Sequence, residues 1–326
     1  MSAAILAALM MSETSLCCPR VYCGRFAPSP TGLLHFGSLV AAVGSYLDAC
    51  VHGGRWLVRI EDVDTPRAVP GAGDAILRTL EGFGFVWDGE VWRQSRRSEA
   101  YRDALACLQA AGHVYPCGCS RSEIAAVAGR KSIDGGLLYP GTCRAGLAAR
   151  RTARAWRLRV PDREWRFSDR VQGEVRQNLA RDTGDFVVLR ADGLFAYQLA
   201  VVVDDAAQGV NAVVRGADLI DSVVRQIWLQ QCLGLPAPSY AHLPVAVNAA
   251  GEKLSKQTRA PEVDVAQGSR LLCEVCAFLG HPPPIDLYGA PLADFWRWAI
   301  SAWSINRVPK RLKMPHHSCV GRDGLK

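Results

Sequence analysis

The chain has 326 residues, of which 49% are hydrophobic, enough to fill the core of one large or two ordinary globular domains. Its 38 Lys and Arg against 31 Asp and Glu give a formal net charge of +7, which permits a nucleic-acid partner without establishing one. No run of about 18 apolar residues occurs, and the apolar start lacks the basic residues of an export signal. We therefore expect a cytoplasmic globular protein with no membrane association, whose twelve cysteines are reduced.

Residues 1–20 show no interpretable pattern, and we expect them to form a disordered N-terminal extension. The core begins with an apolar strand over residues 21–26, followed by a Pro- and Gly-rich loop and a buried helix over residues 38–50. A second strand follows at residues 55–60. This order predicts two parallel strands with a ligand at their carboxyl ends. The free N–H groups at the helix start predict an anion site, for which ATP and a dinucleotide are equally reasonable.

Three carboxylates follow the second strand within four residues, namely those of Glu61, Asp62 and Asp64. They repel one another unless cations offset their charge, so the cluster indicates a bound amine or a metal ion. The alternative is a solvated acidic turn, and the sequence at this point favours neither. Helices are predicted next, over residues 73–82 and 98–112.

An Arg- and Gly-rich stretch in the middle of the chain contains Cys117, Cys119 and Cys143. Two cysteines one residue apart and a third beyond a turn can place three thiolates on one tetrahedral metal ion. A fourth ligand is needed, for which His113 is conventional and Tyr139 is unusual. The alternative is that the three cysteines are plain reduced thiols.

Sheet-like patterning returns further along, where strands over residues 186–190 and 195–203 flank an Asp-Gly turn. Another buried strand, over residues 213–218, carries Arg215 near its end. At such a position an arginine either binds a carboxylate or forms half of a structural ion pair. An amphipathic helix is expected over residues 222–233, stopped by a glycine and a proline.

A loop late in the chain places Lys253 and Lys256 on a flexible, Gly-containing segment. Lysines held in this way can neutralise the charge that develops on a polyphosphate, although most lysines are simply solvated. Beyond the loop, a helix over residues 271–280 carries Cys273 and Cys276. Their spacing in an apolar helix indicates core packing rather than metal binding.

The order and spacing of these motifs resemble the catalytic core of class I glutamyl-tRNA synthetases. Residues 28–37, Pro-Ser-Pro-Thr-Gly-Leu-Leu-His-Phe-Gly, stand for the HIGH signature, and residues 253–257, Lys-Leu-Ser-Lys-Gln, stand for KMSKS with a glutamine in place of the last serine. Within that group the chain looks most like the short paralogues, the glutamyl-Q tRNA(Asp) synthetases. The runs that favour the paralogues are His-Phe-Gly-Ser at residues 35–38, RIEDVDTPR at residues 59–67 and FAYQLAVVVDD at residues 195–205. The resemblance covers residues 21–265, and less clearly the part that follows.

The resemblance implies a class I, Rossmann-type α/β fold, in which a zinc-containing insertion that binds the acceptor interrupts a parallel sheet. Because the chain ends soon after the lysine loop, we expect it to lack the anticodon-binding domain of a discriminating glutamyl-tRNA synthetase. The expected divisions are the first half of the catalytic domain at 21–114, the insertion at 115–184, the second half with the KMSKS-like loop at 185–260, a short helical C-terminal region at 261–315 and a tail at 316–326.

A two-step, ATP-dependent ligase reaction is also implied by the resemblance. L-Glutamate and ATP, which brings Mg²⁺ with it, would first give glutamyl-adenylate without tRNA. A hydroxyl of queuosine at the wobble position of tRNA(Asp) would then take the glutamyl group. The catalytic domain itself would hold the anticodon arm, and we expect a monomer. Two alternatives stay open: a truncated glutamyl-tRNA synthetase that charges a tRNA 3′ end, and a catalytically silent tRNA-binding module.

The positions that match the family's motifs carry its functional residues over to this chain. Glu61 would accept the substrate ammonium, and Arg25 and Arg215 would neutralise the two carboxylates. The implied catalytic residues are His35, Lys253 and Lys256. The residues implied for ATP are His35, Gly37, Ser38 and Lys256. The residues implied for L-glutamate are Arg25, Phe26, Ala27, Pro28, Ser29, Glu61, Tyr197 and Arg215.

The family's Cys-x-Cys and Tyr-x-x-x-Cys pattern also matches this chain, and it favours Tyr139 over His113 as the fourth metal ligand. With four protein ligands and no open position, one zinc per chain would be structural and would brace the insertion. The implied ligands are Cys117, Cys119, Tyr139 and Cys143.

Overall fold

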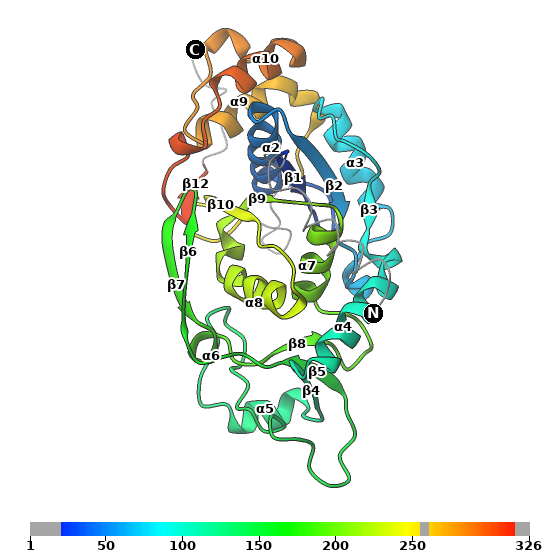
Figure 1. The fold of residues 1–326 in the computed structure, drawn as a ribbon. Helices are drawn as coiled ribbons and strands as arrows, with labels where there is room; N and C mark the ends of the chain where they lie inside the picture. Colours follow the sequence, from blue (N-terminus) through cyan, green and yellow to red (C-terminus); the bar gives the residue numbers. More distant parts are fainter. Residues whose placement is uncertain (1–20, 255–260, 317–326) are drawn as a thin grey trace.

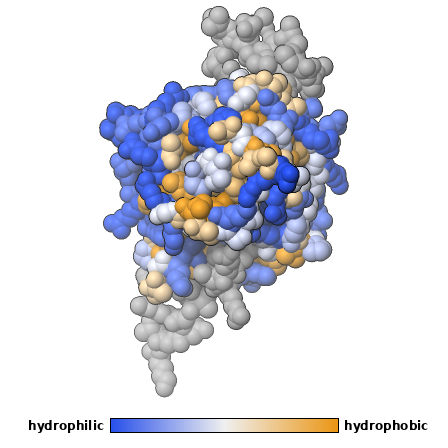
Figure 2. All heavy atoms as spheres, turned by 90° about the horizontal axis from the view of Figure 1, so that it is seen from below, coloured by the Kyte–Doolittle hydropathy of each residue, from blue (hydrophilic) through white to orange (hydrophobic). Residues whose placement is uncertain are grey.

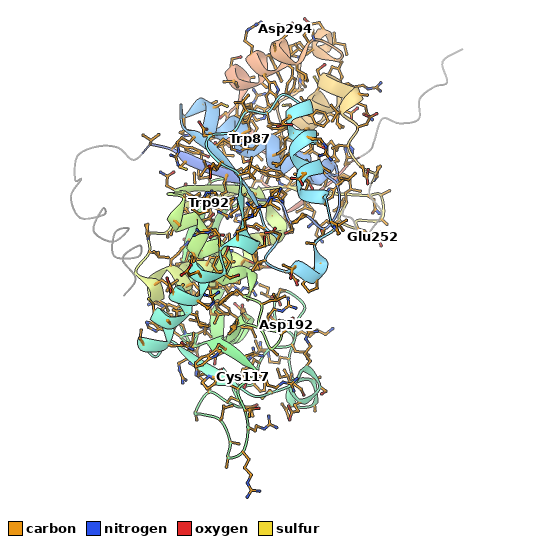
Figure 3. The ribbon with its side chains drawn as sticks, turned by 90° about the vertical axis from the view of Figure 1, so that its right-hand side faces the viewer. Trp87, Trp92, Cys117, Asp192, Glu252 and Asp294 are labelled. Atoms are coloured by element: carbon orange, nitrogen blue, oxygen red, sulfur yellow. The ribbon has the colours of Figure 1, made fainter. Side chains whose placement is uncertain are left out.

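The structure is a computed structural model that describes residues 21–254 and 261–316. The expected N-terminal extension, Lys256 and all but the first residue of the expected tail lie outside the described residues. A parallel sheet occupies the middle of an elongated molecule, with the C-terminal helices at one end and the cysteine-containing region at the other (Figure 1). Figure 3 shows the same arrangement from the side, with Asp294 and Cys117 near opposite ends.

The first strand–helix–strand unit is confirmed. It consists of β1 (Cys23–Phe26), α2 (Phe36–Val51) and β2 (Arg55–Ile60), and the two strands pair in parallel. A two-residue strand, β3 (Trp92–Arg93), adds to the free side of β2, again in parallel. Apolar residues spaced by four along α2 turn one face of the helix into the core. That face is fully buried at Leu39, Val43 and Leu47.

The second half of the sheet is built from later strands. β9 (Ala212–Gly216) pairs in parallel with β10 (Ser239–Leu243), and β10 pairs in parallel with β6 (Glu164–Asp169). A backbone hydrogen bond from Asn211 to Cys23, 3.0 Å long, joins the start of β9 to β1. The strands therefore place their carboxyl ends along one edge, which is where ligands bind in open parallel sheets.

The larger helices lie close to their predicted positions. Gly234 follows the helix α8 (Val223–Leu233) and has a left-handed backbone (φ +67°). It therefore ends this helix, as its position in the sequence predicted. Cys273 and Cys276 are buried in the hydrophobic core, which confirms the prediction of core packing. These helices are α3 (Ala72–Gly82), α4 (Ser98–Ala110), α8 (Val223–Leu233) and α9 (Gly268–Phe278). A further helix, α10 (Leu292–Ala302), lies in the C-terminal region, for which no helix bounds were predicted.

A small antiparallel sheet, in the order β4-β5-β8, forms at the predicted insertion, and its third strand lies just beyond the predicted boundary at residue 184. Between β5 and β8 the chain reaches the main sheet through the antiparallel pair of β6 and β7, of which β6 pairs with β10. Seen from this end of the molecule, hydrophilic residues dominate the rim of the surface and apolar residues gather nearer its middle (Figure 2). The additional elements are β4 (Val114–Cys117), α5 (Arg121–Val127), β5 (Ala155–Leu158), β7 (Gly173–Asn178), α6 (Leu179–Asp182) and β8 (Phe186–Leu189).

The prediction of a strand over residues 195–203 is wrong, because most of these residues belong to the helix α7 (Tyr197–Ala207). The turn before it is present, since the amide of Arg190 donates to the carbonyl of Leu194. A continuous apolar run suits a buried helix as well as a buried strand. Here α4 and α8 both pack against the segment, so residues on several sides of the helix are buried. They include Leu199, Ala200, Val201 and Val202.

The C-terminal region folds back onto an earlier part of the chain. After α10, the strand β12 (Lys313–Pro315) pairs in parallel with β11 (Val245–Val247). This contact lies next to the segment that carries Lys253. Among the described residues, none of the helices has the length and apolar character needed to cross a membrane.

Candidate active site

A cavity of about 550 Å³ opens at the carboxyl ends of β1, β2 and β9. Segments that are far apart in the sequence meet in its wall, and together they supply almost every site residue implied by the sequence. Lys256 lies outside the described residues. The predicted residues that line the cavity are Arg25, Phe26, Ala27, Pro28, Ser29, His35, Gly37, Ser38, Glu61, Tyr197, Arg215 and Lys253.

One side of this cavity is formed by the start of α2. His35 caps the helix, and its Nδ1 accepts a hydrogen bond from the amide of Ser38 at 3.2 Å. A Cβ at Gly37 would lie 3.2 Å from Cε1 of His35 and 3.5 Å from the carbonyl oxygen of Leu254, so a side chain would crowd this turn. The first turn carries no acidic residue. The positive end of the helix dipole therefore faces the cavity and suits a phosphate.

A lysine lies in the same part of the cavity wall as the helix start, because the next residue, Leu254, lies against Gly37. Lys253 Nζ pairs with Asp218 Oδ2 at 2.6 Å, and both residues line the cavity. Both side chains are partly exposed, so the pair adds little to stability. Its effect is to hold an ammonium group at the cavity wall.

The guanidinium of Arg215 forms the opposite end of the cavity. It is buried at the end of β9, and its Nη2 donates to the carbonyl of Leu219 and to Oε1 of Gln226. Among the described residues, no carboxylate forms a salt bridge with Arg215, and its Nη1 has no hydrogen-bond partner. The reading of Arg215 as half of a structural ion pair is therefore not supported. A buried cation with an unused donor fits an anionic ligand.

A buried ionic network stands behind the same end of the cavity. Arg59 is fully buried, and its Nη2 lies 2.7 Å from Asp205 Oδ1 and 3.1 Å from Glu61 Oε1. Asp205 in turn pairs with Arg25 Nε at 3.3 Å. Two cations thus hold two carboxylates, and each member of the network is fixed by a charged neighbour.

The two carboxylates respond differently to this environment. Burial raises the pKa of Glu61, and the charges of Arg59 and Arg25 offset only part of that rise. Burial alone would also raise the pKa of Asp205, but Arg25 and Arg59 hold it below its usual range. Glu61 is thus the carboxylate whose charge has the least compensation, and a ligand ammonium would supply the missing partner.

The predicted cluster of three carboxylates is divided by the structure. Of the three, only Glu61 lines the smaller cavity. Asp62 accepts hydrogen bonds from the amide and hydroxyl of Ser95, both at 2.8 Å, and Asp64 pairs with Arg190 at 3.1 Å. Two of the three carboxylates therefore hold neighbouring segments in place, although all three line the larger cavity that is described below.

Tyr197 lies at the first turn of α7 and contributes to the walls of both this cavity and the next. Burial raises the pKa of its phenol, so the hydroxyl stays protonated at neutral pH and can donate a hydrogen bond.

A larger cavity of about 1190 Å³ adjoins the first and extends towards the predicted insertion. The two cavities share Ser29, Glu61 and Tyr197 in their walls. Arginines and carboxylates both line this cavity, and the carboxylates are those of Glu61, Asp62, Asp64, Asp192 and Asp218. A guanidinium group can pair with a phosphate. The arginines that line this cavity are Arg67, Arg121, Arg154, Arg157 and Arg190.

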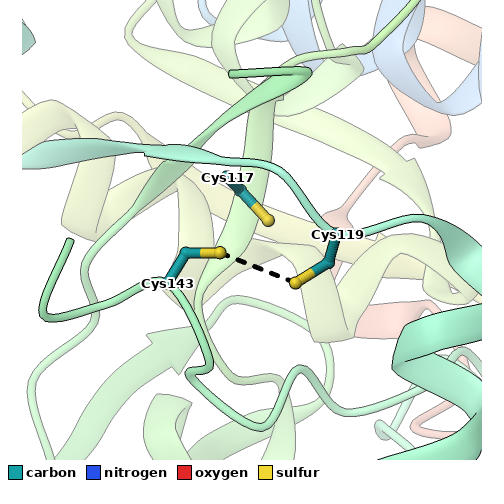
Figure 4. Close-up of side chains that lie close together, drawn as sticks. All are labelled: Cys117, Cys119 and Cys143. Atoms are coloured by element: carbon teal, nitrogen blue, oxygen red, sulfur yellow. Dashed lines mark hydrogen bonds between the residues drawn. The ribbon is translucent and has the colours of Figure 1, made fainter. Parts of the chain in front are cut away.

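The three cysteines of the insertion form one cluster (Figure 4). Their sulfurs lie within 4.8 Å of one another, and those of Cys119 and Cys143 are 3.6 Å apart. The hydroxyl of Tyr139 lies 3.4 Å from the sulfur of Cys117. The ring of His113 packs against a tryptophan instead, outside the cluster.

This donor set fits a tetrahedral zinc ion. Zn–S bonds of about 2.3 Å separate two sulfurs on a tetrahedron by about 3.8 Å, close to the spacing seen here. Burial alone would raise the pKa of Cys117, but its hydrogen bonds with Tyr139 and Arg157 lower it. The guanidinium of Arg157 also stacks on the Tyr139 ring at 3.8 Å. A nearby cation favours the thiolate form that binds a metal.

Four residues behind the cavity were not predicted to belong to the site: Arg59, Asp205, Asp169 and His242. For two of them the sequence held a signal, because Arg59 interrupts an apolar strand and Asp205 ends an apolar run. A charge inside a buried strand indicates a buried partner. His242 and Asp169 carry no comparable signal, since their contact depends on the pairing of β6 with β10.

Comparisons with known proteins agree with this architecture. Residues 22–270 match the family model described as tRNA synthetases class I (E and Q), catalytic domain. The chain is 64% identical over 290 residues to the glutamyl-Q tRNA(Asp) synthetase of Dechloromonas aromatica, covering 89% of this chain and 96% of that protein. It is 61% identical over 289 residues to the protein of the same name from Chromobacterium violaceum, covering 89% and 96%.

A solved structure shows the same fold. The glutamate-tRNA synthetase of Elizabethkingia anophelis aligns with a TM-score of 0.75 at 25% identity, covering 92% of this chain and 68% of that one. Fold and cavity together define a class I tRNA synthetase catalytic domain with a parallel sheet. The sequence identity to these relatives identifies one family within that class, and the chain belongs to the glutamyl-Q tRNA(Asp) synthetase family.

Proposed function

We propose that the protein activates L-glutamate with ATP to glutamyl-adenylate, without tRNA, and then transfers the glutamyl group to queuosine at the wobble position of tRNA(Asp). Its relatives, which are glutamyl-Q tRNA(Asp) synthetases, support this choice of acceptor. The observation that carries the first step is the 550 Å³ cavity, which has a helix start and a lysine on one side and Arg25, Arg215 and Glu61 on the other. It therefore pairs a phosphate site with a site for a dicarboxylic amino acid.

In this proposal the amino acid is held by opposite charges. Glu61 accepts hydrogen bonds from the substrate ammonium, and Tyr197 adds a hydroxyl contact. Arg215 offers its unused Nη1 to a substrate carboxylate, and Arg25 neutralises the other one. Phe26, Ala27, Pro28 and Ser29 shape the wall. Glutamine in place of glutamate would leave an arginine without a counter-charge, which costs a few kcal/mol in a buried site.

ATP would occupy the side formed by α2. Amides of the first turn at Gly37 and Ser38, together with His35, would hold its phosphates. A magnesium ion would enter with ATP and neutralise phosphate charge. Lys253 would contribute positive charge towards the leaving pyrophosphate, and Lys256, outside the described residues, is proposed for the same role. Charge stabilisation of this kind supplies catalysis without a protein nucleophile.

The chemistry then follows from positioning. An oxygen of the glutamate α-carboxylate attacks the α-phosphorus of ATP, the bond to the bridging oxygen breaks, and pyrophosphate leaves. In the second step a hydroxyl of the queuosine cyclopentene ring attacks the carbonyl carbon, forms an ester and releases AMP. The larger cavity would admit the acceptor nucleoside, since it shares Glu61 and Tyr197 with the smaller one and its arginines suit a tRNA backbone.

For the cysteine cluster we propose a structural zinc held by Cys117, Cys119, Tyr139 and Cys143. All four positions would be protein ligands, so no coordination site would be left for catalysis. The ion would tie β4 to the loop that carries Cys143, and so brace the part of the molecule that lines the larger cavity.

Two assays test the proposal. Purified protein with ATP and glutamate should exchange labelled pyrophosphate into ATP in the absence of tRNA, and glutamine should support much less exchange. Labelled glutamate should then be incorporated into tRNA(Asp) that contains queuosine and not into tRNA(Asp) that lacks it. Failure of the exchange would exclude glutamate activation, and salt-sensitive tRNA binding without exchange would favour a silent binding module.

A second acceptor deserves its own control, because the fold also matches a glutamate-tRNA synthetase. Periodate destroys a free 3′-terminal ribose diol, and an ester at that position protects it. Product that resists periodate would mean that the tRNA 3′ end is charged. Product whose 3′ end stays sensitive agrees with esterified queuosine.

A further inference from the structure

The guanidinium of Arg215 is held by the protein through two of its three nitrogens. Its Nε donates to Nε2 of His242 at 3.1 Å, and its Nη2 donates to Leu219 and Gln226 at 3.2 and 3.0 Å. Nη1 has no partner among residues 21–254 and 261–316, although the side chain is only 5% exposed. The remaining nitrogen is thus the one left for a ligand in the cavity that Arg215 lines.

This arrangement determines which nitrogen of His242 carries a proton. An arginine has only donors, so Nε2 of His242 must be an unprotonated acceptor. The proton of the neutral ring therefore sits on Nδ1, which lies 2.6 Å from Oδ2 of Asp169. His242 is fully buried on β10, directly opposite Arg215 of β9.

Asp169 is itself fixed as an acceptor. Its Oδ1 accepts the backbone amides of Val171, Gln172 and His242 at 3.0, 2.9 and 3.1 Å. Burial alone would raise the pKa of Asp169, but the hydrogen bonds from His242 and these amides hold it below its ordinary value. Burial also lowers the pKa of His242. A charged Asp169 beside a neutral His242 is therefore the state at neutral pH.

We propose that Asp169 and His242 are positioning residues for amino-acid recognition, because Asp169 sets the tautomer of His242 and His242 in turn fixes the guanidinium of Arg215 for a substrate carboxylate. The inference rests on the proposed function. It gives a role to the end of β6, which lies outside the cavity wall and joins the main sheet only through β10. A purely structural role for the buried pair is the competing explanation.

The variant Asp169→Asn separates the two explanations. The new amide can still accept the three backbone amides through its oxygen, but it presents an N–H group to Nδ1 of His242. The ring must then accept at Nδ1 and carry its proton on Nε2, where it faces the Nε–H of Arg215. Such a swap of tautomer leaves the fold in place and removes the orientation of the arginine.

We expect Asp169→Asn to raise the KM for glutamate in pyrophosphate exchange by about 10- to 100-fold, because one charge-assisted contact to the substrate is misplaced. The KM for ATP and the kcat at saturating glutamate should stay within about threefold of the wild-type values. The Kd for glutamate, measured by calorimetry, should rise by the same factor. Asp48→Asn is the matched control. Asp48 is equally buried and accepts from Tyr22 and Arg170, but it has no contact with the cavity.

A second pair of variants decides the question if Asp169→Asn does not fold. In His242→Gln the amide oxygen can accept from Arg215 while the amide nitrogen donates to Asp169, so the KM for glutamate should stay within about fivefold of wild type. In His242→Leu both contacts are lost and the KM should rise by about 10- to 100-fold, since Arg215 loses one of its fixed partners.

The outcomes are distinct. If Asp169→Asn and Asp48→Asn both lower the thermal midpoint and leave the Kd for glutamate unchanged, or if His242→Leu binds glutamate as tightly as His242→Gln, the proposal is overturned. If wild-type protein binds glutamate but shows no exchange, the proposed function alone fails and the Kd values still decide. If wild-type protein binds no glutamate, both fail.

Discussion

Arg59 Nη2 lies 3.1 Å from Glu61 Oε1, in a position where no part of the arginine reaches solvent. The contact orients a carboxylate at the wall of the smaller cavity while leaving its charge poorly compensated, as the raised pKa of Glu61 indicates. A folded-state pKa above the ordinary value means that the folded protein favours the neutral acid, so the charge on Glu61 lowers stability at neutral pH. The fold therefore gains nothing from the charge of Glu61, and the ligand ammonium proposed for this site would supply its partner.

Glu61→Gln is therefore expected to separate binding from stability. Glutamine keeps an oxygen that can accept from Arg59, so the free energy of unfolding should be unchanged or slightly higher. The substrate ammonium loses its charged partner, so the KM for glutamate in pyrophosphate exchange should rise at least about 30-fold, which corresponds to about 2 kcal/mol. Glu81→Gln, at an exposed position of α3, should change neither quantity. A variant Glu61→Gln with wild-type KM would remove Glu61 from the amino-acid site.

Replacement of Arg59, in contrast, should lower the free energy of unfolding. Arg59→Met leaves the carboxylates of Glu61 and Asp205 in the interior without their shared cation, and breaking a buried pair in this way costs about 3–5 kcal/mol. Urea unfolding should show this loss in the free energy of unfolding. Arg297→Ala removes an exposed i,i+3 pair with Asp294 and should cost less than about 0.5 kcal/mol. Equal losses in the two variants would contradict the buried network.

The glycine at the start of α2 provides a test of the phosphate site. A methyl group at Gly37 would lie 3.2 Å from the ring of His35 and close to the Leu254 carbonyl, so Gly37→Ala should displace the residues around the helix start. We expect the KM for ATP to rise by about tenfold, because a positioning error of this size weakens the phosphate contacts. Gly129→Ala is the control, since a Cβ there meets nothing within 4 Å. An unchanged KM for ATP would argue against phosphate binding at this turn.

Local patterns predicted the first βαβ unit and the residues at its strand ends because their chemistry is confined to short stretches of sequence. A ligand site is predicted separately by the Pro- and Gly-rich loop, by Glu61 and by the Lys253 loop. All three lie at the smaller cavity, where the parallel strands β1 and β2 end. The prediction of a strand over residues 195–203 was wrong because the apolar run in this segment has no periodicity. Whether such a run forms a strand or a helix depends on what packs around it, here α4 and α8.

The supporting contacts could not be predicted for a different reason. Asp169 and His242 are 73 residues apart, and they meet because β6 returns from the insertion to pair with β10. No local pattern encodes that return. The fourth ligand of the cysteine cluster was likewise open between His113 and Tyr139 on spacing alone. The family resemblance favoured Tyr139, and in the fold its hydroxyl lies beside the sulfurs while His113 packs elsewhere.

Metal analysis tests the proposed zinc site. Purified protein should contain about one zinc per chain, and Cys117→Ser or Cys143→Ser should lose it, because removal of one thiolate from a set of four ligands sharply weakens the site. Cys107→Ser is the matched control, since Cys107 lies on α4 outside the cluster. The thermal midpoint should fall with the metal in the first two variants only. Zinc content that is unaffected by Cys117→Ser would rule out the assignment.

The pH dependence of stability should show the buried histidine directly. Burial lowers the pKa of His242 in the folded protein below its ordinary value of 6.5, and the groups that face the ring are Asp169, Arg215, Asp218 and Tyr240. The unfolded chain therefore takes up a proton as the pH falls through about 6.5, whereas the folded chain does not. The resulting stability is complete above that pH and is lost below it, by at most about 1.4 kcal/mol per pH unit for each such histidine.

Buried His281, whose pKa is also lowered chiefly by burial, contributes in the same direction. We therefore compare urea unfolding at pH 7.5 and 5.5 in wild type and in His242→Gln, which keeps the hydrogen bonds to Asp169 and Arg215 but cannot titrate. Between the two pH values the variant should lose less free energy of unfolding than wild type, because His281 still titrates and residue 242 no longer does. An identical loss in both proteins would mean that His242 does not stay neutral in the folded state.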